Sequence, residues 1–540
     1  MLTRALSGKK EPAPADYYQN NCCTLLDFVL ARYRDLLGKD EVSHYESFLA
    51  AGTDAQRLVA RLLTRKGPAF RVDLLEYREI LDLEHAVDEL VTLGLLVRND
   101  RFAGDKLLNL LRKDELLDLD QSLSKQLRKK EILERLISAR TDDQIRQLVF
   151  ARFAIIELKN QHFWDLARLL FFGESGGDWS TFVLHDLGMV EYENVALKER
   201  QFESRVDLDL NLYSRTLSRL SHEVSEHPNL AHDLLSVLSK LTGDRFVVRR
   251  RDRSTLRIAH HLERQQRFDE AIAAYASVAR HPARERHVRL LHKSGREAEA
   301  KVVLGQIRED PLSEEEAQFA ERFGQRNRGF QPETFEVSVP ELDADTNIES
   351  QALACLASTR ELVLGAHVEN TMVRTLTGLV YWPIIFLDLP GAFTNPFQSG
   401  PNDLYAEDFV DARAGEIRAL EQSFSHEGAL RKHIERVMSE KWNKANGLVS
   451  WSMIETLPLQ DLLNVMPEDH IRALTSFQIR RLPQFRTGLP DLCVVDADGQ
   501  YEFIEVKGPN DQLQPVQRLW FKHFHDMGIP ARVMKIRIAA

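Results

Sequence analysis

Apolar residues recur every three or four positions along most of the chain before residue 300, which is the spacing of amphipathic helices. Residues 25–37 (LLDFVLARYRDLL) and 54–66 (DAQRLVARLLTRK) show this spacing, and the second run stops at a Gly-Pro pair that ends helices. In residues 85–100 a helical run ends at Gly94, and a short apolar strand (LLV) follows. Helices closed by a small strand predict a winged-helix-like unit within residues 1–104, and plain helical packing fits the same pattern.

Residues 105–140 contain two short amphipathic helices joined by a polar segment. Four basic residues cluster at the start of the second helix: Lys125, Arg128, Lys129 and Lys130. The first turn of a helix offers unpaired N–H groups, so basic side chains there suit DNA phosphates. The segment resembles a SAP motif, a small DNA-binding helical hairpin. A solvated helix face is the simpler explanation of the same charges.

Residues 141–345 continue the helical pattern and contain the most basic part of the chain. The run RFVVRRRDR (245–253) is dense in arginine, and residues 255–305 hold ten Lys/Arg against six Asp/Glu. The small-residue and aromatic spacing of residues 255–305 is typical of two tetratricopeptide-like helical hairpins. Residues 307–345 are acidic and contain prolines, which predicts a linker with an extended segment at 334–339.

The composition narrows the class of protein. The 540 residues are 43% hydrophobic and 28% charged, as in soluble globular proteins, and this length suggests about three or four domains. The formal net charge is −11, from 71 Lys+Arg and 82 Asp+Glu. This balance argues against a bulk polycation. It leaves room for a local basic groove, because phosphate binding depends on clustered charge rather than on net charge.

The cysteines and the apolar runs bear on the compartment. Four cysteines without a C-x-x-C pair argue against a disulfide scaffold and a zinc finger, and they fit a reducing compartment. The N-terminal sequence MLTRALSGKKEPAPADYY has no long apolar stretch, and no apolar run approaches the length of a membrane span. We therefore expect a cytoplasmic, nucleoid-associated protein without membrane contact.

The sharpest chemical signal lies in a predicted β-hairpin over residues 492–507 (LCVVDADGQYEFIEVK), with an Asp-Gly turn. Asp491 precedes the first strand, whereas Glu505 and Lys507 lie two positions apart on the return strand and share a face. The hairpin should bring these three side chains together. Carboxylate oxygens bind Mg²⁺ or Mn²⁺, and a nearby lysine can neutralise phosphate charge, as metal-dependent phosphodiester hydrolysis requires. Chance spacing on a solvated strand is the alternative.

The complete string carries more information than the spacing. Pro-Asp, thirteen residues, Glu-Val-Lys, Gly-Pro-Asn-Asp and a Gln-x-x-Trp resemble the VRR-NUC branch of the PD-(D/E)XK nuclease superfamily over roughly the last sixty residues. The resemblance implies that Asp491 and Glu505 are metal ligands and that the Val506 carbonyl also faces the metal. It further implies that Lys507 is the catalytic lysine and that Gln517 completes the catalytic set at the start of the supporting helix.

Residues 367–405 are similar to the start of the nuclease unit in the Fanconi-anaemia-associated nuclease family. The match implies that Glu369 is a further metal ligand, supplied in that family by a helical glutamate. The expected fold is multidomain and mainly α: a helical N-terminal region, a SAP-like hairpin, a tetratricopeptide-like region, and a C-terminal α/β nuclease domain over 346–540 with its VRR-NUC part at 450–540. Eukaryotic members carry a ubiquitin-binding zinc finger, and this chain, without a matching Cys/His set, looks like a bacterial member.

The resemblance implies a 5′-flap endonuclease with 5′→3′ exonuclease activity, of the phosphodiesterase I type, in DNA interstrand-crosslink repair. It implies one or two Mg²⁺ or Mn²⁺ ions and a monomer bound to branched or 5′-flap DNA. The candidates for a 5′-phosphate pocket are Arg284, Arg286, His287, Arg289 and Lys293. Two alternatives stay open: a Holliday-junction-type or restriction-like endonuclease, which needs a dimer, and a helical-repeat DNA-binding scaffold with an inactive nuclease domain.

Overall fold

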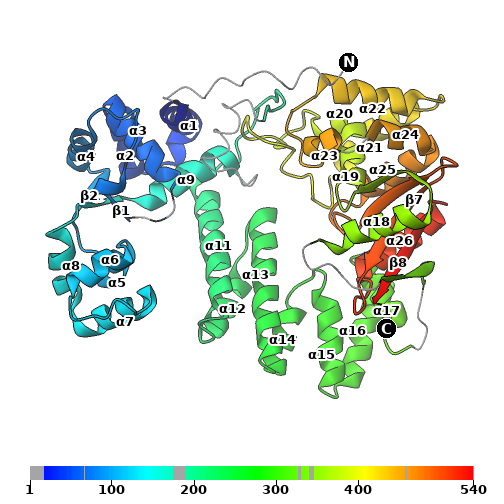
Figure 1. Cartoon of the computed structure of the whole chain (residues 1–540), viewed down its shortest axis with the longest axis horizontal. Coiled ribbons are helices and arrows are strands. Elements are labelled where there is room, and N and C mark those ends of the chain that lie inside the picture. The colour runs from blue at the N-terminus through cyan, green and yellow to red at the C-terminus, as the bar shows by residue number, and fades with distance from the viewer. Residues whose placement is uncertain are drawn as a thin grey trace. The chain divides into compact units, whose positions relative to one another are not determined.

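The computed structural model describes residues 17–65, 67, 69–173, 190–325, 330–339, 346–456 and 459–538. The chain divides into two compact units. The first comprises Met1–Glu191 and Arg200–Arg205, and the second comprises Tyr192–Glu199 and Val206–Ala540. Both are rich in helices, and the five-stranded sheet belongs to the second (Figure 1). No helix in the described parts of the chain is long and apolar enough to cross a membrane.

The first unit is helical around a small antiparallel sheet with the strand order β1-β3-β2. Its strands are β1 (Ala69–Arg71), β2 (Leu96–Arg98) and β3 (Ile155–Leu158). Its helices outside the SAP-like segment are α1 (Tyr17–Tyr33), η2 (Arg34–Leu36), α2 (Lys39–Leu49), α3 (Thr53–Leu63), η3 (Val72–Leu74), α4 (Leu83–Thr92) and α9 (Gln161–Phe172). The central strand β3 lies well beyond residue 104, so the sheet is completed only after the SAP-like segment.

The SAP-like segment belongs to a small helical group with its own core. Its helices are α5 (Gly104–Asn109), α6 (Lys113–Leu119), α7 (Lys129–Ala139) and α8 (Asp142–Phe150). Leu107, Leu116, Ile132 and Ile145 are buried together, one from each helix. Because these apolar residues recur at helical spacing, each helix turns one face inward and leaves its charged face in solvent.

The second unit starts with α11 (Arg205–Glu223), α12 (Leu230–Lys240), α13 (Arg245–Arg264), α14 (Phe268–Ala276), α15 (Ala283–Lys293) and α16 (Glu297–Glu309). The hairpins α13–α14 and α15–α16 repeat at an interval of 29 residues. Gln266 and Gly295, 29 apart, both adopt positive φ at the hairpin turn. Arg267 and Arg296 follow them, and each pairs with a glutamate three residues later. Equivalent turns and pairs support the repeat reading.

Residues 307–345 differ from the expected linker. Their described parts form α17 (Glu314–Arg322) and β4 (Thr334–Val339), and β4 pairs in parallel with the last strand of the sheet, β8 (Ala531–Ile538). Glu314 of α17 accepts a hydrogen bond from Arg481 at 2.7 Å and contacts His523. The alternating residues of TFEVSV suit an edge strand, and pairing with β8 satisfies their backbone groups.

The C-terminal part of the second unit is built on the sheet β4-β8-β7-β6-β5, in which β6 is antiparallel to both its neighbours. The remaining strands are β5 (Leu362–His367), β6 (Leu492–Asp496) and β7 (Tyr501–Lys507). Its helices are α18 (Ile348–Thr359), α19 (Met372–Val380), α20 (Trp382–Ile385), η5 (Asp411–Arg413), α21 (Ala414–Ser423), α22 (Ala429–Glu440), α23 (Trp451–Thr456), α24 (Leu459–Val465), α25 (Glu468–Arg480) and α26 (Pro515–Asp526). The mainly α fold with a C-terminal α/β domain is thus confirmed.

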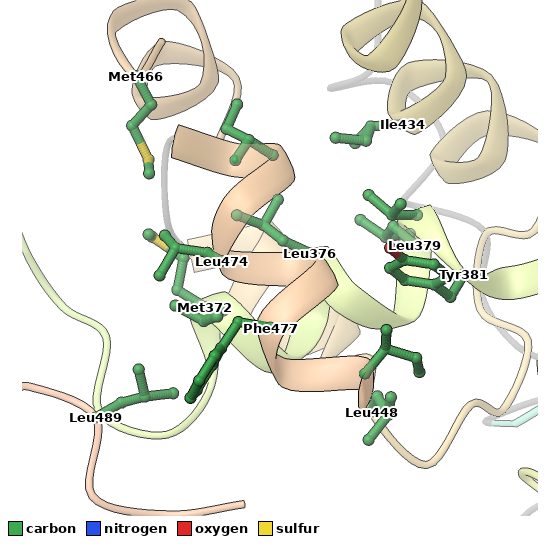
Figure 2. Close-up of a cluster of buried hydrophobic side chains, with 14 of the residues drawn as sticks. Met372, Leu376, Leu379, Tyr381, Ile434, Leu448, Met466, Leu474, Phe477 and Leu489 are labelled. Atoms are coloured by element: carbon green, nitrogen blue, oxygen red, sulfur yellow. The ribbon is translucent and has the colours of Figure 1, made fainter. Parts of the chain in front are cut away.

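Both faces of this sheet are covered. One face packs against α18, with Leu492, Ile504 and Val506 in its core. The other face packs against α19, α25 and α26, and Figure 2 shows Met372 and Leu376 of α19 lying against side chains of α25. The central strands β6 and β7 are buried over most of their length, and most of their residues are apolar. Buried charged residues on these two strands therefore stand out as functional candidates.

Candidate active site

The predicted hairpin brings the three candidate side chains together. Leu492 pairs with Ile504 in the antiparallel ladder, so Asp491 and Glu505 lie at the next position on each strand. Glu505 and Lys507 alternate with residues of the α18 face and therefore point to the opposite side. Asp491 is 8% exposed and Glu505 only 1%. The acidic pair is consequently buried at the end of the β6–β7 hairpin rather than on a solvated strand.

Hydrogen bonds hold this group in one arrangement. The Val506 N–H donates to Asp491 Oδ2 at 2.8 Å. Lys507 Nζ lies 2.7 Å from Glu505 Oε1. The amide of Val506, rather than its carbonyl, is the group that contacts Asp491, and the carbonyl's approach to a metal stays a prediction. The lysine thus lies beside the carboxylates, where it could meet phosphate charge.

Gln517 anchors the site from α26. Its Nε2 donates to Glu505 Oε1 at 2.5 Å, while its Oε1 accepts the backbone N–H of Gln514 at 2.9 Å. The second bond is half of a capping box, which satisfies a free N–H group at the helix start. Because the amide oxygen is occupied by the backbone, the amide nitrogen is directed at Glu505. The glutamine therefore orients the carboxylate.

A glycine allows α26 to approach the strand this closely. Gly488 has a φ of +88°, and a Cβ there would lie 2.7 Å from Val516 Cγ1 and 3.4 Å from the Gln517 nitrogen. Asn370 accepts the next N–H, that of Leu489, at 3.2 Å. The Gly-Leu-Pro-Asp segment thus requires glycine at its first position both for backbone conformation and for space.

The electrostatics of the pair favour a bound cation. Burial raises the pKa of Asp491 to about 6, and the negative charge of Glu369 raises it further. The hydrogen bond from the Val506 N–H acts in the opposite direction and lowers it. Burial and the charge of Asp491 raise the pKa of Glu505 to about 7, although Lys507 opposes the shift. Among the described residues, Glu505 Oε2 is buried without a hydrogen-bond partner. Two destabilised carboxylates and an unpartnered oxygen fit a divalent cation, which would supply the missing positive charge.

Glu369 lies beside this pair, together with a histidine that the sequence did not single out. Glu369 follows β5 in the turn before α19 rather than in a helix. His367 is the last residue of β5, and one donor atom each of His367, Glu369 and Asp491 lie within 4.8 Å of one another. In the sequence, the one feature that marked His367 was its position two residues before the candidate ligand Glu369. Such a spacing is too common to identify a metal ligand by itself.

The basic residues of the SAP-like segment gather at the start of α7, as expected. Lys125, Arg128, Lys129 and Lys130 are all exposed, and in the described parts of the chain none forms an ion pair with a carboxylate. Lys129 Nζ donates to the Asn109 carbonyl at 3.1 Å. The charges are therefore available to an external anion.

The candidates for a phosphate pocket have partners of their own. Three arginines pair with carboxylates: Arg284 with Glu316 at 2.5 Å, Arg286 with Glu263 at 3.2 Å and Arg289 with Glu285 at 2.8 Å. Lys293 lies over the Phe268 ring. Burial and nearby Arg296 lower the pKa of His287. These interactions leave the residues less suited to a free anion than the sequence alone suggests.

A different arginine cluster lies in the same unit. Arg249 and Arg253 sit one turn apart on α13, Arg280 lies in the α14–α15 connection, and Arg486 precedes Asp491 by five residues. Partial burial and repulsion from Arg280 lower the pKa of both Arg249 and Arg253. In the described chain, Arg253, Arg280 and Arg486 have no carboxylate within ion-pair distance. Converging arginines that repel one another favour a bound anion.

Comparisons with known proteins show which families and structures the chain resembles. Family models match two segments, residues 16–97 to a "FAN1, HTH domain" and residues 428–537 to a "VRR-NUC domain". A Fanconi-associated nuclease 1 homolog from Pseudomonas aeruginosa is 32% identical over 542 aligned residues, 96% of each chain. A homolog from Arabidopsis thaliana is 25% identical over 98% of this chain and 68% of its own. A crystal structure of paFAN1 bound to DNA with a two-nucleotide 5′ flap and a gap superposes with a TM-score of 0.86 at 29% identity, covering 98% of this chain and 99% of that one.

Proposed function

The chain belongs to the Fanconi-associated nuclease family, and from this premise we propose that it is a metal-dependent nuclease that cuts DNA near a 5′ flap and trims it 5′→3′. The observation that supports a 5′-flap substrate is the similarity, along nearly the whole chain, to a protein crystallised with 5′-flap DNA. Nuclease chemistry is the family's, and the buried Asp491–Glu505 pair beside Lys507 supports an active rather than a vestigial domain. Action on crosslinked DNA as a monomer is part of the proposal.

In this proposal, Glu369, Asp491, Glu505 and the Val506 carbonyl hold the cation, Mg²⁺ or Mn²⁺. The chemistry supplied by such a cation is polarisation of the scissile phosphate and a lowered pKa of bound water. The ammonium of Lys507 lies directly beside the carboxylates that would hold the cation. A phosphate bound to that cation would therefore lie near Lys507, which would neutralise its negative charge. Gln517 holds Glu505 in position and touches no substrate.

Two surfaces serve as DNA contacts. The exposed Lys125, Arg128, Lys129 and Lys130 would bind backbone phosphates of a duplex arm. The arginine cluster at Arg249, Arg253, Arg280 and Arg486 is a better place for a 5′ phosphate than the ion-paired residues of α15. Clustered contacts of this kind reconcile a net charge of −11 with a DNA substrate.

The direct test is cleavage of end-labelled 5′-flap, 3′-flap and four-way-junction DNAs with Mg²⁺ or Mn²⁺. We expect the 5′ flap to be cut on one strand near the branch, by protein that is monomeric in light scattering. Preferred cutting of the four-way junction by a dimer would favour a junction resolvase instead. A lack of cleavage on all substrates, with no bound metal, would favour a DNA-binding scaffold.

Replacing Arg253 and Arg280 together with glutamine should weaken DNA binding and flatten its dependence on salt. Each lost phosphate contact should reduce the slope of log affinity against log salt by about 0.9. The measurement is fluorescence anisotropy of a flap duplex at several salt concentrations. Arg289→Gln is the matched control. Because Arg289 is already paired with Glu285, this substitution should leave the slope unchanged. Equal slopes in the natural protein and both variants would show that the arginine cluster does not contact DNA.

The substitutions Lys125→Ala, Lys129→Ala and Lys130→Ala test the SAP-like surface by the same measurement.

A further inference from the structure

His367 stands at a junction of the sheet that fixes its place beside the acidic residues. It is the last residue of β5 and pairs with Leu492, the neighbour of Asp491. The next backbone N–H, that of Val368, donates to the Asp491 carbonyl at 2.7 Å. This bond ties the end of β5 to the start of β6. The backbone of His367 is therefore fixed beside Asp491 by strand pairing.

The imidazole of His367 is free to accept a ligand. Its Nε2 lies 3.8 Å from Glu369 Oε2, and within the described residues the structure records no hydrogen bond from this ring. The side chain is 52% exposed, so solvent and ions reach it. Glu505, by contrast, has its Oε1 engaged by Gln517 and Lys507. The open side of the site is thus the one formed by His367 and Glu369.

The separations suit one shared cation. One donor atom each of His367, Glu369 and Asp491 lie within 4.8 Å of one another. Ligands at about 2.0–2.6 Å from a common ion can be separated by at most about twice that distance. The three residues come from the end of a strand, a turn and the start of another strand, and the buried Glu505 Oε2 nearby has no partner in the described structure.

We propose that His367 supplies a nitrogen ligand to the cation held by Glu369 and Asp491, and that it biases this position toward Mn²⁺ over Mg²⁺. The inference rests on the proposed metal-dependent nuclease function and adds a ligand and an ion preference to it. Mg²⁺ prefers an all-oxygen shell and keeps its waters, whereas Mn²⁺, a softer transition-metal ion, accepts an imidazole nitrogen more readily than Mg²⁺ does. A site with two carboxylates and one imidazole therefore discriminates between the two ions more than a site of carboxylates alone.

The experiment measures the bound ion directly. Pulsed electron paramagnetic resonance of Mn²⁺ added to the full chain, without DNA, detects coupling to a coordinated ¹⁴N nucleus. We expect this coupling in the natural protein and its loss in His367→Ala and His367→Gln. Calorimetric titration should show that the Mn²⁺ affinity of His367→Ala is lower by about tenfold or more. Removing a residue that only hydrogen-bonds to a metal ligand already costs about this much, and loss of a ligand should cost at least as much. Mg²⁺ affinity should change little, so the ratio of the two affinities falls.

Two controls separate the outcomes. His426→Ala removes an exposed histidine of another segment and should keep both the coupling and the affinity ratio. Unchanged thermal unfolding shows that His367→Ala still folds, and His367→Gln, which offers an oxygen, should retain Mg²⁺ binding. Mn²⁺ binding without ¹⁴N coupling, or an equal loss for both ions, would overturn the role of His367 and leave the nuclease proposal intact. A natural protein that binds neither ion would overturn both.

Discussion

Replacing Asp491 with Asn, Glu505 with Gln or Lys507 with Ala should each lower cleavage of a 5′-flap duplex by about 10³-fold or more. The two carboxylates are buried side by side and hold raised pKa values, so each substitution removes a group that a cation needs. Lys507 lies 2.7 Å from Glu505, where its charge can reach the phosphate. Single-turnover cleavage of end-labelled DNA measures the effect, and fluorescence anisotropy measures binding, which should stay largely unchanged.

A carboxylate on the same hairpin provides the control for this series. Asp498 is exposed in the β6–β7 turn, away from the buried end that holds Asp491. Asp498→Asn should therefore cleave at the natural rate. Full activity in all three site variants would reject the assignment of the active site. Activity lost together with DNA binding would show that the substitutions unfold the domain rather than disable its chemistry.

Gly488→Ala should destabilise the nuclease domain by about 2–4 kcal/mol, since it combines an unfavourable backbone conformation with a steric overlap. The φ of +88° disfavours any side chain, and the new Cβ would meet Val516 at 2.7 Å. We expect relief of this overlap to displace Val516 and the start of α26, which carries Gln517 and its hydrogen bond to Glu505. Cleavage should therefore fall as well. Urea unfolding followed by circular dichroism measures the loss of stability.

Gly499 offers the matched control, because it shares the backbone conformation and lacks the contact. Its φ is +73°, and a Cβ there would have no neighbour within 4 Å. Gly499→Ala should lower the free energy of unfolding by about 1–2 kcal/mol, which is the effect of the unfavourable backbone conformation alone. Cleavage should stay near the natural rate. If both glycine variants unfold at the same urea concentration and cleave equally well, the close packing of α26 on Gly488 does not support the site.

The local parts of the candidate site followed from the sequence. A hairpin with a short turn joins neighbours in the chain, so the pairing of Asp491 with Glu505 needed only the apolar run LCVV, the strand YEFIEVK and the Asp-Gly turn. The expected hairpin is confirmed, and the helix expected after it is observed as α26. The repeat hairpins α13–α14 and α15–α16 were also readable, because helical periodicity is a local property.

Long-range pairing was not readable in the same way. The extended segment at 334–339 gave no hint that it would pair with β8, about 200 residues later. The basic residues of α15 looked free in the sequence, yet Arg284 meets Glu316 and Arg286 meets Glu263. A charge count records how many arginines are present and not which of them face a carboxylate. Arg280 and Arg486, far apart in the chain, likewise become part of one cluster only in space.

The sequence by itself determined the type of chemistry: the residue kinds and spacing of the D…E-V-K hairpin, the helical character of most of the chain, and the family to which these motifs point. The tertiary structure alone decided the surroundings of that chemistry. It buried Asp491 and Glu505 together, placed His367 beside Asp491, and used Gly488 to admit Gln517. The physical reason is that spacing along a strand is set by the backbone, whereas burial and charge pairing depend on segments that fold back from distant positions.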